Sequence, residues 1–321
     1  MRYLRWLPVA CLLLGTLAWQ GGRTAAPARG EDPATPKSGA AKPDAAKRVY
    51  RILMLSEAES FKHSSVTRKD GNLSPAERTV TDLGISSGLF HVDCSQDCAK
   101  DFTKEKLANY DLVFFYTQSA PDPKVGPPSK KLPMSKESLD YFFNDWLKQK
   151  GHGYIGTHSA ADTLHESDAY KDMLGAEFRK HPWGNGSHVI VTVHDTKHPA
   201  MKPWGDEFEI ADEIYAFQNW HPENVRVLMS INMEKTAHKE PFHVPVAWCR
   251  DYGEGKVFYI SLGHDESVWA NPKYQQSLLG AIKWELNLEP GDATPNPDVS
   301  KAQQKQAEEA YAADPNKKPP R

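Results

Sequence analysis

The sequence predicts an α/β fold in which helices cover a mostly parallel central sheet and antiparallel strands are added at its edge. In the first half of the chain, short apolar runs alternate with helical patterns, which is typical of buried parallel strands joined by helices. In the second half, strand-like runs follow one another after short turns. Short connections of this kind favour antiparallel neighbours, because parallel strands need long crossovers.

The elements of the first half are defined by four apolar runs and one helical stretch. The runs are predicted as strands at residues 50–55, 89–92, 112–116 and 153–157. Ahead of the last strand, apolar residues recur at helical spacing between residues 139 and 147. Ser135 is placed to cap this helix, and Gly151 is placed to end it.

The second half adds four predicted strands, at residues 188–193, 225–231, 244–248 and 257–262. A final helix begins at Asn271-Pro272, a cap followed by proline, and runs through Trp284. Together these elements predict a single flavodoxin-like domain that spans residues 49–288.

The N-terminal segment has the pattern of a secretory signal. Arg2 and Arg5 precede an apolar run of 14 residues, and Ala26 and Ala28 are spaced as a signal peptidase prefers. We therefore expect residues 1–28 to be a signal peptide and the protein to be secreted or periplasmic, with no membrane attachment after cleavage. The alternative is an uncleaved anchor, although the run is shorter than the roughly 20 residues that span a bilayer.

Two segments are predicted to be disordered, a linker at residues 29–48 and a tail at residues 289–321. Both are poor in large apolar side chains. Without such side chains to bury, little offsets the entropy that ordering the chain would cost.

Composition and motifs exclude several kinds of partner. Lys and Arg total 39 against 42 for Asp and Glu, so no basic excess indicates nucleic acid. The chain has no GxGxxG after the first predicted strand and no GxxxxGK[ST] motif, so no nucleotide cofactor is expected.

Three cysteines lie beyond the signal segment, and an odd number cannot all pair within one chain. Cys94 and Cys98 are close enough in sequence to close a small loop, or both stay free thiols; Cys249 is the third. No CxxC pair supports a zinc ribbon or a thioredoxin site.

The carboxyl ends of the parallel strands are the expected position of a ligand site. This rule selects residues 56–65, 117–120 and 157–163, two of which carry a histidine beside hydroxyl groups: His63 with Ser64, and His158 with Ser159. The second segment has the shape of a nucleophile elbow, where hydrolases place Ser or Cys. A histidine at that point acts as a general base, a metal ligand or a hydrogen-bond donor, or is simply a buried, satisfied side chain.

Histidine and tryptophan are concentrated in the second half. Eleven of 13 histidines lie between His152 and His264, and three or four that converge could hold a divalent metal; the candidates are His158, His181 and His264. No HExxH spacing is present, and dispersed surface histidines are the alternative. Trp183 and Trp220 are candidates for stacking on sugar rings, with core packing as the alternative.

A series of motifs runs in order through residues 49–288. They are Phe61-Lys62-His63-Ser64, GTHSA at 156–160, His181-Pro182, His198-Pro199, Asp212-Glu213-Ile214-Tyr215, PVAWCR at 245–250, YGEGKVFY at 252–259 and Leu262-Gly263-His264. Together they resemble the trehalose-utilisation (ThuA-like) family.

The resemblance implies a fold like that of class I glutamine amidotransferases, in which a cysteine occupies the elbow. His158 stands at that position here, so cysteine glutaminase activity is not expected. The family is associated with the breakdown of trehalose and related disaccharides through keto-sugar intermediates. The polar positions that match the family are His63, His158, His181, Asp212, Glu213, Tyr215 and His264.

Three functions stay open at this point, the last of them an interaction domain presented on a tether, whose Lys- and Pro-rich tail contacts a partner. The first is an exported enzyme of hydrolase, lyase or isomerase type that acts on a small carbohydrate, with or without a divalent metal. Its candidate catalytic residues are His63, His158, Glu213 and His264, and its candidate substrate-binding residues are Ser64, Ser159, Asp212, Tyr215, Trp183 and Trp220. The second is a non-catalytic sugar-binding module on the same scaffold.

Overall fold

The computed structural model describes residues 48–119, 132–317 and 319. The predicted signal peptide and residues 29–47 of the predicted linker lie outside the described residues. None of the helices in the described ranges has the length and apolarity that crossing a bilayer requires.

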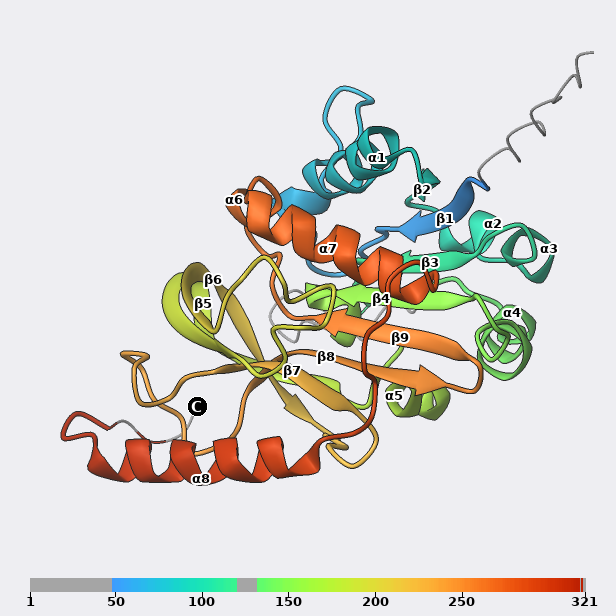
Figure 1. The fold of residues 1–321 in the computed structure, drawn as a ribbon. Helices are drawn as coiled ribbons and strands as arrows, with labels where there is room; N and C mark the ends of the chain where they lie inside the picture. The colour runs from blue at the N-terminus through green and yellow to red at the C-terminus, as the bar shows by residue number, and fades with distance from the viewer. Residues whose placement is uncertain (1–47, 120–131, 318, 320–321) are drawn as a thin grey trace, which may run out of the picture. The chain divides into compact units, whose positions relative to one another are not determined.

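In the described part of the chain, nine strands form one sheet with the order β2-β1-β3-β4-β9-β8-β7-β5-β6 (Figure 1). The strands are β1 Tyr50–Leu55, β2 Phe90–Ser95, β3 Leu112–Phe115, β4 Gly153–Thr157, β5 Glu177–Val193, β6 Glu207–Gln218, β7 Arg226–Ile231, β8 Pro245–Tyr252 and β9 Gly255–Ile260. From β2 to β9 all neighbours are parallel, and from β9 to β6 all are antiparallel. The predicted mostly parallel sheet with antiparallel additions is therefore confirmed.

Helices cover both faces of the parallel part. The helices are α1 Pro75–Ser87, α2 Cys98–Asp101, α3 Lys104–Leu107, α4 Lys136–Tyr141, α5 Asp168–Leu174, α6 Glu266–Trp269, α7 Pro272–Glu285 and α8 Pro297–Ala313, with shorter turns η1 Ser64–Val66, η2 Phe142–Trp146 and η3 His158–Ala161. Of these, α8 packs against β7 of the antiparallel part. Successive strand residues face opposite sides, so Ile52 joins a core with α1 and α7, whereas Leu53 joins a core with α4 and α5. The result is a three-layer α/β/α arrangement.

The helix predicted before β4 has a different form in the structure. Ser135 caps α4 as predicted, by accepting from the backbone N–H of Ser138. After Tyr141, however, the helix widens into the π-helical turn η2, in which the N–H of Leu147 donates to the carbonyl of Phe142 over 2.9 Å. The helical spacing predicts the helix but not this widening, because the π turn depends on how the bulky residues pack beneath the sheet.

A long antiparallel ribbon, β5 with β6, is largely missing from the sequence prediction. Only residues 188–193 of β5 are predicted, and β6 is not predicted at all. β6 mixes acidic and apolar residues, so it lacks the continuous apolar run of the parallel strands. The pairing of β5 with β6 shifts register three times between Phe178 and Ser187, which bends the ribbon (Figure 1).

The prediction of a disordered tail at residues 289–321 is wrong for most of that segment. Residues 297–313 form α8, in which Ala307 is fully buried and Ser300 is nearly so. The Trp220 indole donates to the Ser300 hydroxyl, and the Gln304 amide donates to the carbonyl of Pro241. Small buried residues and hydrogen bonds keep α8 packed against the rest of the fold. A prediction based on the number of large apolar side chains takes neither into account.

Cys94, Cys98 and Cys249 are free thiols in the described structure, so the loop between Cys94 and Cys98 is not closed by a disulfide. Cys98 and Cys249 are buried, and burial raises the pKa of both thiols well above 9. Both therefore pack as small apolar side chains and are not poised as thiolates.

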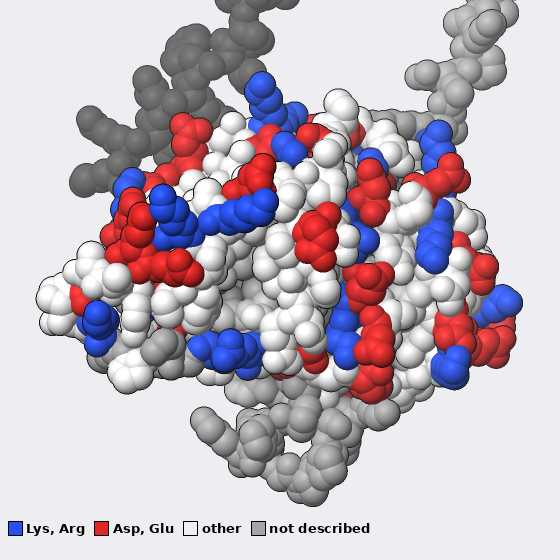
Figure 2. Space-filling model, turned by 90° about the horizontal axis from the view of Figure 1, so that it is seen from below, with Lys and Arg blue, Asp and Glu red and all other residues white. Residues whose placement is uncertain are grey.

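Figure 2 views the molecule from the side on which α8 lies in Figure 1. Lys and Arg side chains are interspersed there with Asp and Glu side chains, and neither sign forms a continuous patch over the described residues of this face. The electrostatic potential over this face therefore has no single sign.

Candidate metal centre

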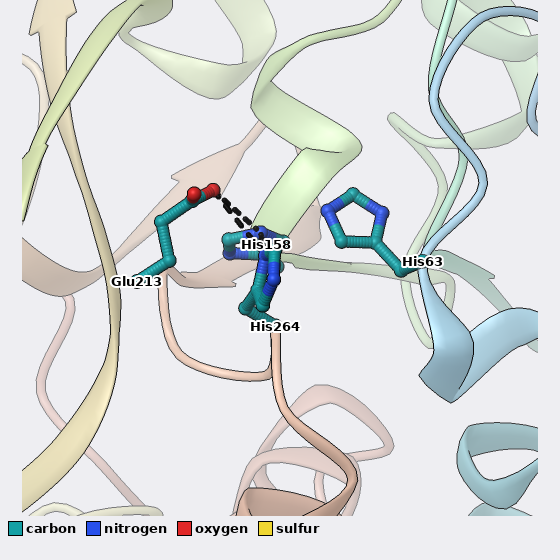
Figure 3. A group of neighbouring side chains, drawn as sticks. All are labelled: His63, His158, Glu213 and His264. Carbon is teal, nitrogen blue, oxygen red and sulfur yellow. Dashed lines mark hydrogen bonds and ion pairs between the residues drawn. The ribbon is translucent and has the colours of Figure 1, made fainter. Parts of the chain in front are cut away.

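Four predicted site residues meet at the carboxyl edge of the parallel strands (Figure 3). His63 follows β1, His158 follows β4, His264 follows β9, and Glu213 reaches the same place from β6 on the bent ribbon. Each offers one ligand atom, and these atoms all lie within 4.8 Å of one another. Below we call these four residues the metal cluster.

His158 occupies the predicted elbow. Its φ is +44°, in the left-handed region that residues with a Cβ rarely adopt, as at a strained strand-to-helix turn. The side chain is fully buried, and its Nδ1 donates to the carbonyl of Ser261 over 2.9 Å. This bond leaves Nε2 directed at the cluster. Metal-bound histidines are commonly held in the same way, with the second ring nitrogen donating to a carbonyl.

Glu213 and His264 complete one side of the cluster. Nδ1 of His264 lies 3.3 Å from Nε2 of His158 and 3.3 Å from Oε1 of Glu213, and Nε2 of His158 lies 3.6 Å from the same oxygen. Burial acts to raise the pKa of Glu213, but hydrogen bonds and charge interactions with both histidines hold that pKa well below its usual range. For His264, burial acts to lower the pKa and the Glu213 carboxylate raises it. Glu213 is therefore an anion facing two imidazoles.

Asp212 holds the turn that carries His264. One oxygen accepts from the N–H of Gly263 at 2.7 Å, and the other accepts from the N–H of Asp265 at 3.2 Å. The φ of Gly263 is +126°, which only glycine adopts readily, so this turn needs glycine just before the ligand. Burial raises the pKa of Asp212. Its bonds are to backbone, so Asp212 supports the cluster without joining it.

His63 closes the opposite side. Its ring is only 3% exposed, and its centroid lies 4.8 Å from those of both His158 and His264. Burial, with the neighbouring histidines, lowers the pKa of His63 well below its usual value, so the ring is neutral near pH 7. Its Nδ1 is buried and has no hydrogen-bond partner among the described residues. Leaving a buried nitrogen unpaired is energetically costly.

The donor set fits a divalent transition metal. Bonds of about 2.1 Å at tetrahedral angles place ligand atoms about 3.4 Å apart. The separations among the His158, Glu213 and His264 ligand atoms are 3.3, 3.3 and 3.6 Å. Three imidazoles with one carboxylate suit zinc or a similar first-row ion. Of the predicted metal candidates, His158 and His264 lie in the cluster.

His181, the third metal candidate, lies at the edge of the cluster. Its Nδ1 is 3.7 Å from Oε2 of Glu213, the oxygen that faces away from His158 and His264, and its side chain is 55% exposed. His181 is thus the one of these histidines that reaches solvent.

The predicted substrate-binding residues are placed very differently from one another. The Tyr215 ring is buried with its centroid 4.3 Å from that of His158, and the Ser159 hydroxyl is buried with no hydrogen-bond partner among the described residues. Ser64 is exposed at the start of η1. Tyr215 and Ser159 therefore form the wall behind His158, whereas Ser64 lies on the surface.

Trp183 and Trp220 do not present open faces for stacking, contrary to the prediction. Trp183 is 2% exposed and its indole donates to the carbonyl of His238. Trp220 packs against Trp248 with ring centroids 5.1 Å apart and bonds to Ser300 of α8. Both tryptophans pack against the core, which was the alternative interpretation.

Two groups near the cluster were not predicted as site residues, although Phe61 belongs to one of the family motifs. Phe61, half exposed, lies edge-on to His63 with centroids 4.8 Å apart. Gln118 follows β3 and bonds to the backbone just ahead of His63. The strand-end rule selects residues 117–120, but that segment has no histidine or carboxylate to draw attention to it.

Comparison with known proteins gives a family and a fold. The ThuA family model, described as trehalose utilisation, matches residues 51–285. A thua-like protein from Bacteroides uniformis ATCC 8492 is 19% identical, with a TM-score of 0.53 over 81% of this chain and 100% of that chain. A second, from Parabacteroides merdae ATCC 43184, is 14% identical, with a TM-score of 0.54 over 79% of this chain and 99% of that chain.

No curated protein shows significant similarity to the chain. At identities of 19% and 14% the solved structures bear on the fold alone, whereas the family model covers most of the folded unit. The chain therefore belongs to the ThuA family, with its glutamine amidotransferase-like fold and, at family level, a role related to trehalose utilisation.

Proposed function

We propose that this protein is an exported enzyme of disaccharide or keto-sugar breakdown that works with one divalent metal ion held by His63, His158, Glu213 and His264. The observation that carries the proposal is the cluster itself, in which four ligand atoms lie within 4.8 Å of one another at the strand ends. The family's description supplies the substrate class.

The protonation of two of the four residues supports metal binding, and the raised pKa of His264 means that an ion must displace a proton from that ring. A metal needs neutral imidazole nitrogens and an ionised carboxylate. The lowered pKa of His63, which burial causes, keeps that ring neutral. The lowered pKa of Glu213, which its histidine neighbours cause, keeps that carboxyl ionised.

Each residue then has a defined task. A bound divalent ion would supply Lewis-acid polarisation of a sugar carbonyl or hydroxyl oxygen. His63, His158 and His264 would hold the ion, and Glu213 would balance part of its charge. His181, half exposed beside Glu213, is placed to hold a proton that a bound sugar gives up or takes. The elbow carries no Ser or Cys, so the proposal includes no covalent intermediate there.

Export remains part of the proposal on the strength of residues 1–28 alone. The sequence of the mature N-terminus, read from protein recovered outside the cytoplasm, tests it. A start near Arg29 supports export, and a start that retains Trp6 contradicts cleavage.

Metal content and turnover test the main proposal. Elemental analysis of the purified chain should find about one divalent ion per molecule, and His63→Ala should lose it. Trehalose and keto-disaccharides, screened with the metal-loaded chain and with chain stripped by a chelator, should be turned over only by the loaded form. A chain that binds no divalent ion contradicts the proposal. Binding of a disaccharide without turnover would instead favour the sugar-binding module.

A further inference from the structure

We propose that Gln118 and Asp162 are positioning residues for the metal cluster, because they tie the segment that carries His63 to the segment that carries His158. The inference rests on the proposed metal-binding function and deepens it. Both side chains are almost fully buried, Gln118 at 3% exposed and Asp162 at 6%. Their effect is exerted through the two loops.

The first link runs from Gln118 to the loop ahead of His63. Oε1 of Gln118 accepts three hydrogen bonds, from the N–H of Ser60 at 3.2 Å, the hydroxyl of Ser60 at 2.6 Å and the N–H of Phe61 at 3.0 Å. Phe61 lies two residues before His63 and touches its ring. The loop cannot move away from β3 without breaking bonds to this one buried oxygen.

The second link runs from the same side chain to the loop after His158. Nε2 of Gln118 donates to Oδ2 of Asp162 at 2.8 Å, and the N–H of Ser119 donates to the backbone carbonyl of Asp162 at 3.0 Å. Asp162 follows η3, the turn that begins with His158. One amide therefore accepts from the His63 segment and donates to the His158 segment, a combination that neither a carboxylate nor an ammonium group provides.

The chain of bonds continues to the strand of Glu213. Oδ1 of Asp162 lies 2.9 Å from Nε2 of His165, Nδ1 of His165 lies 2.8 Å from Oε1 of Glu177, and Oε2 of Glu177 accepts from the Asn219 amide at 2.8 Å. Asn219 directly follows β6, which carries Glu213. Both ring nitrogens of His165 face carboxylate oxygens, which accept hydrogen bonds, and these two carboxylates raise the pKa of His165 although burial acts to lower it.

Backbone strain is concentrated along the same chain. Leu164 has φ +51° and Asn219 has φ +50°, both in the left-handed region, as is His158 itself. Such conformations persist where the surrounding contacts over-determine them, and they cluster at functional sites. The network thus joins three of the four ligand segments, and Asp212 holds the fourth, that of His264, on its own.

The affinity of the full chain for Zn²⁺ tests the proposal, measured by competition with a chelator of known affinity. Gln118→Leu removes both ends of the bridge at similar volume and should weaken Zn²⁺ binding by about 10- to 100-fold, as for other residues that orient metal ligands. The visible absorption spectrum of the Co²⁺-loaded variant should also change, because the ligand geometry is altered. A loss of stability alone would not change that spectrum.

Gln304→Leu is the matched control. Gln304 is also a bridging amide: it accepts from the N–H of His243 and donates to the carbonyl of Pro241, and it lies on α8, which packs against β7 and carries no residue of the metal cluster. Its loss should leave Zn²⁺ affinity unchanged. Equal affinities for Gln118→Leu and Gln304→Leu overturn the proposal, while the metal site of the wild type stands.

A second pair of variants covers the case in which Gln118→Leu does not fold. Asp162→Asn can still accept from Gln118 and donate to a neutral His165 ring, so it should keep Zn²⁺ affinity within about threefold of the wild type. Asp162→Ala breaks the chain and should fall to the level expected for Gln118→Leu. Wild-type affinity in Asp162→Ala overturns the proposal. If the wild type binds neither Zn²⁺ nor Co²⁺, the proposed function is contradicted, and this inference, which rests on it, is contradicted as well.

Discussion

Buried histidines occur in two regions of this molecule, and they differ in what their second ring nitrogen faces. In the metal cluster, His158 uses Nδ1 on a carbonyl and leaves Nε2 among other ligand atoms. In the antiparallel half, His243 uses both nitrogens within the fold, Nε2 with the Ser230 hydroxyl at 2.7 Å and Nδ1 with the Ser300 hydroxyl at 3.1 Å. Burial alone therefore does not distinguish a ligand from a structural histidine.

The charges around the two regions differ as well. Burial lowers the pKa of His243 to about 3 and that of His198 to about 4. In the cluster, Glu213 raises the pKa of His264 despite burial. A buried histidine beside a buried carboxylate is equipped to hold a cation, whereas one beside hydroxyl groups serves packing.

The largest expected effect is on metal retention. His158→Ala should lower Zn²⁺ affinity by more than about 100-fold, because it removes a ligand and not merely a residue that orients one. His243→Ala, which alters a partly buried histidine of the other region, should bind Zn²⁺ like the wild type. Chelator competition measures both. Loss of the ion from His243→Ala, or its retention by His158→Ala, would contradict the assignment of His158 as a ligand and His243 as a structural histidine.

Removal of α8 comes next. A chain that ends at Asn296 loses the bonds from Ser300 to Trp220 and His243, and those from Gln304 to His243 and Pro241. At about 1 kcal/mol for each net hydrogen bond, the free energy of unfolding should fall by about 2–4 kcal/mol. Urea unfolding measures the loss, and Zn²⁺ affinity should not change. An unaltered unfolding midpoint would show that the helix contributes nothing.

A single substitution in the antiparallel half should cost less. His243→Ala leaves the hydroxyls of Ser230 and Ser300 without their histidine partner, one of them fully buried, and should lower the free energy of unfolding by about 1–3 kcal/mol. His221→Ala is the control, since that ring is half exposed, and it should stay within about 0.5 kcal/mol of the wild type. Urea melts of the two variants decide the point; equal losses would contradict a structural role for His243.

The smallest effect is the pH dependence that His243 contributes. Its pKa is about 3 in the folded state, below the usual 6.5, so below pH 6.5 the unfolded chain binds a proton that the folded chain does not. The stabilisation is therefore complete above pH 6.5 and decreases as the pH falls, by up to about 1.4 kcal/mol per pH unit. Urea melts from pH 7 to pH 5 should show a shallower fall in His243→Ala. Parallel curves would mean that His243 is protonated in the folded state.

The sequence by itself determined the parallel half and the identity of the cluster. Strands β1 and β4 have the predicted bounds, because a buried strand must be apolar throughout and that pattern is local. His63 and His158 could be placed because they follow parallel strands, whose carboxyl ends lie at one edge of the sheet, whereas His264 was named from the concentration of histidines and the family motif that contains it. For Glu213, the resemblance to the family supplied what the strand pattern did not.

Other features depended on contacts between distant segments, and only the tertiary structure decided them. The bent ribbon β5–β6 delivers Glu213, α8 orders the tail by covering Trp220 and His243, and Gln118 bridges two loops. Trp220 and Ser300 are 80 residues apart in the chain, and Gln118 and Asp162 are 44 residues apart. Local sequence records which groups can bond, but the folded chain determines which of them meet, because burial and hydrogen bonding are satisfied over the whole molecule.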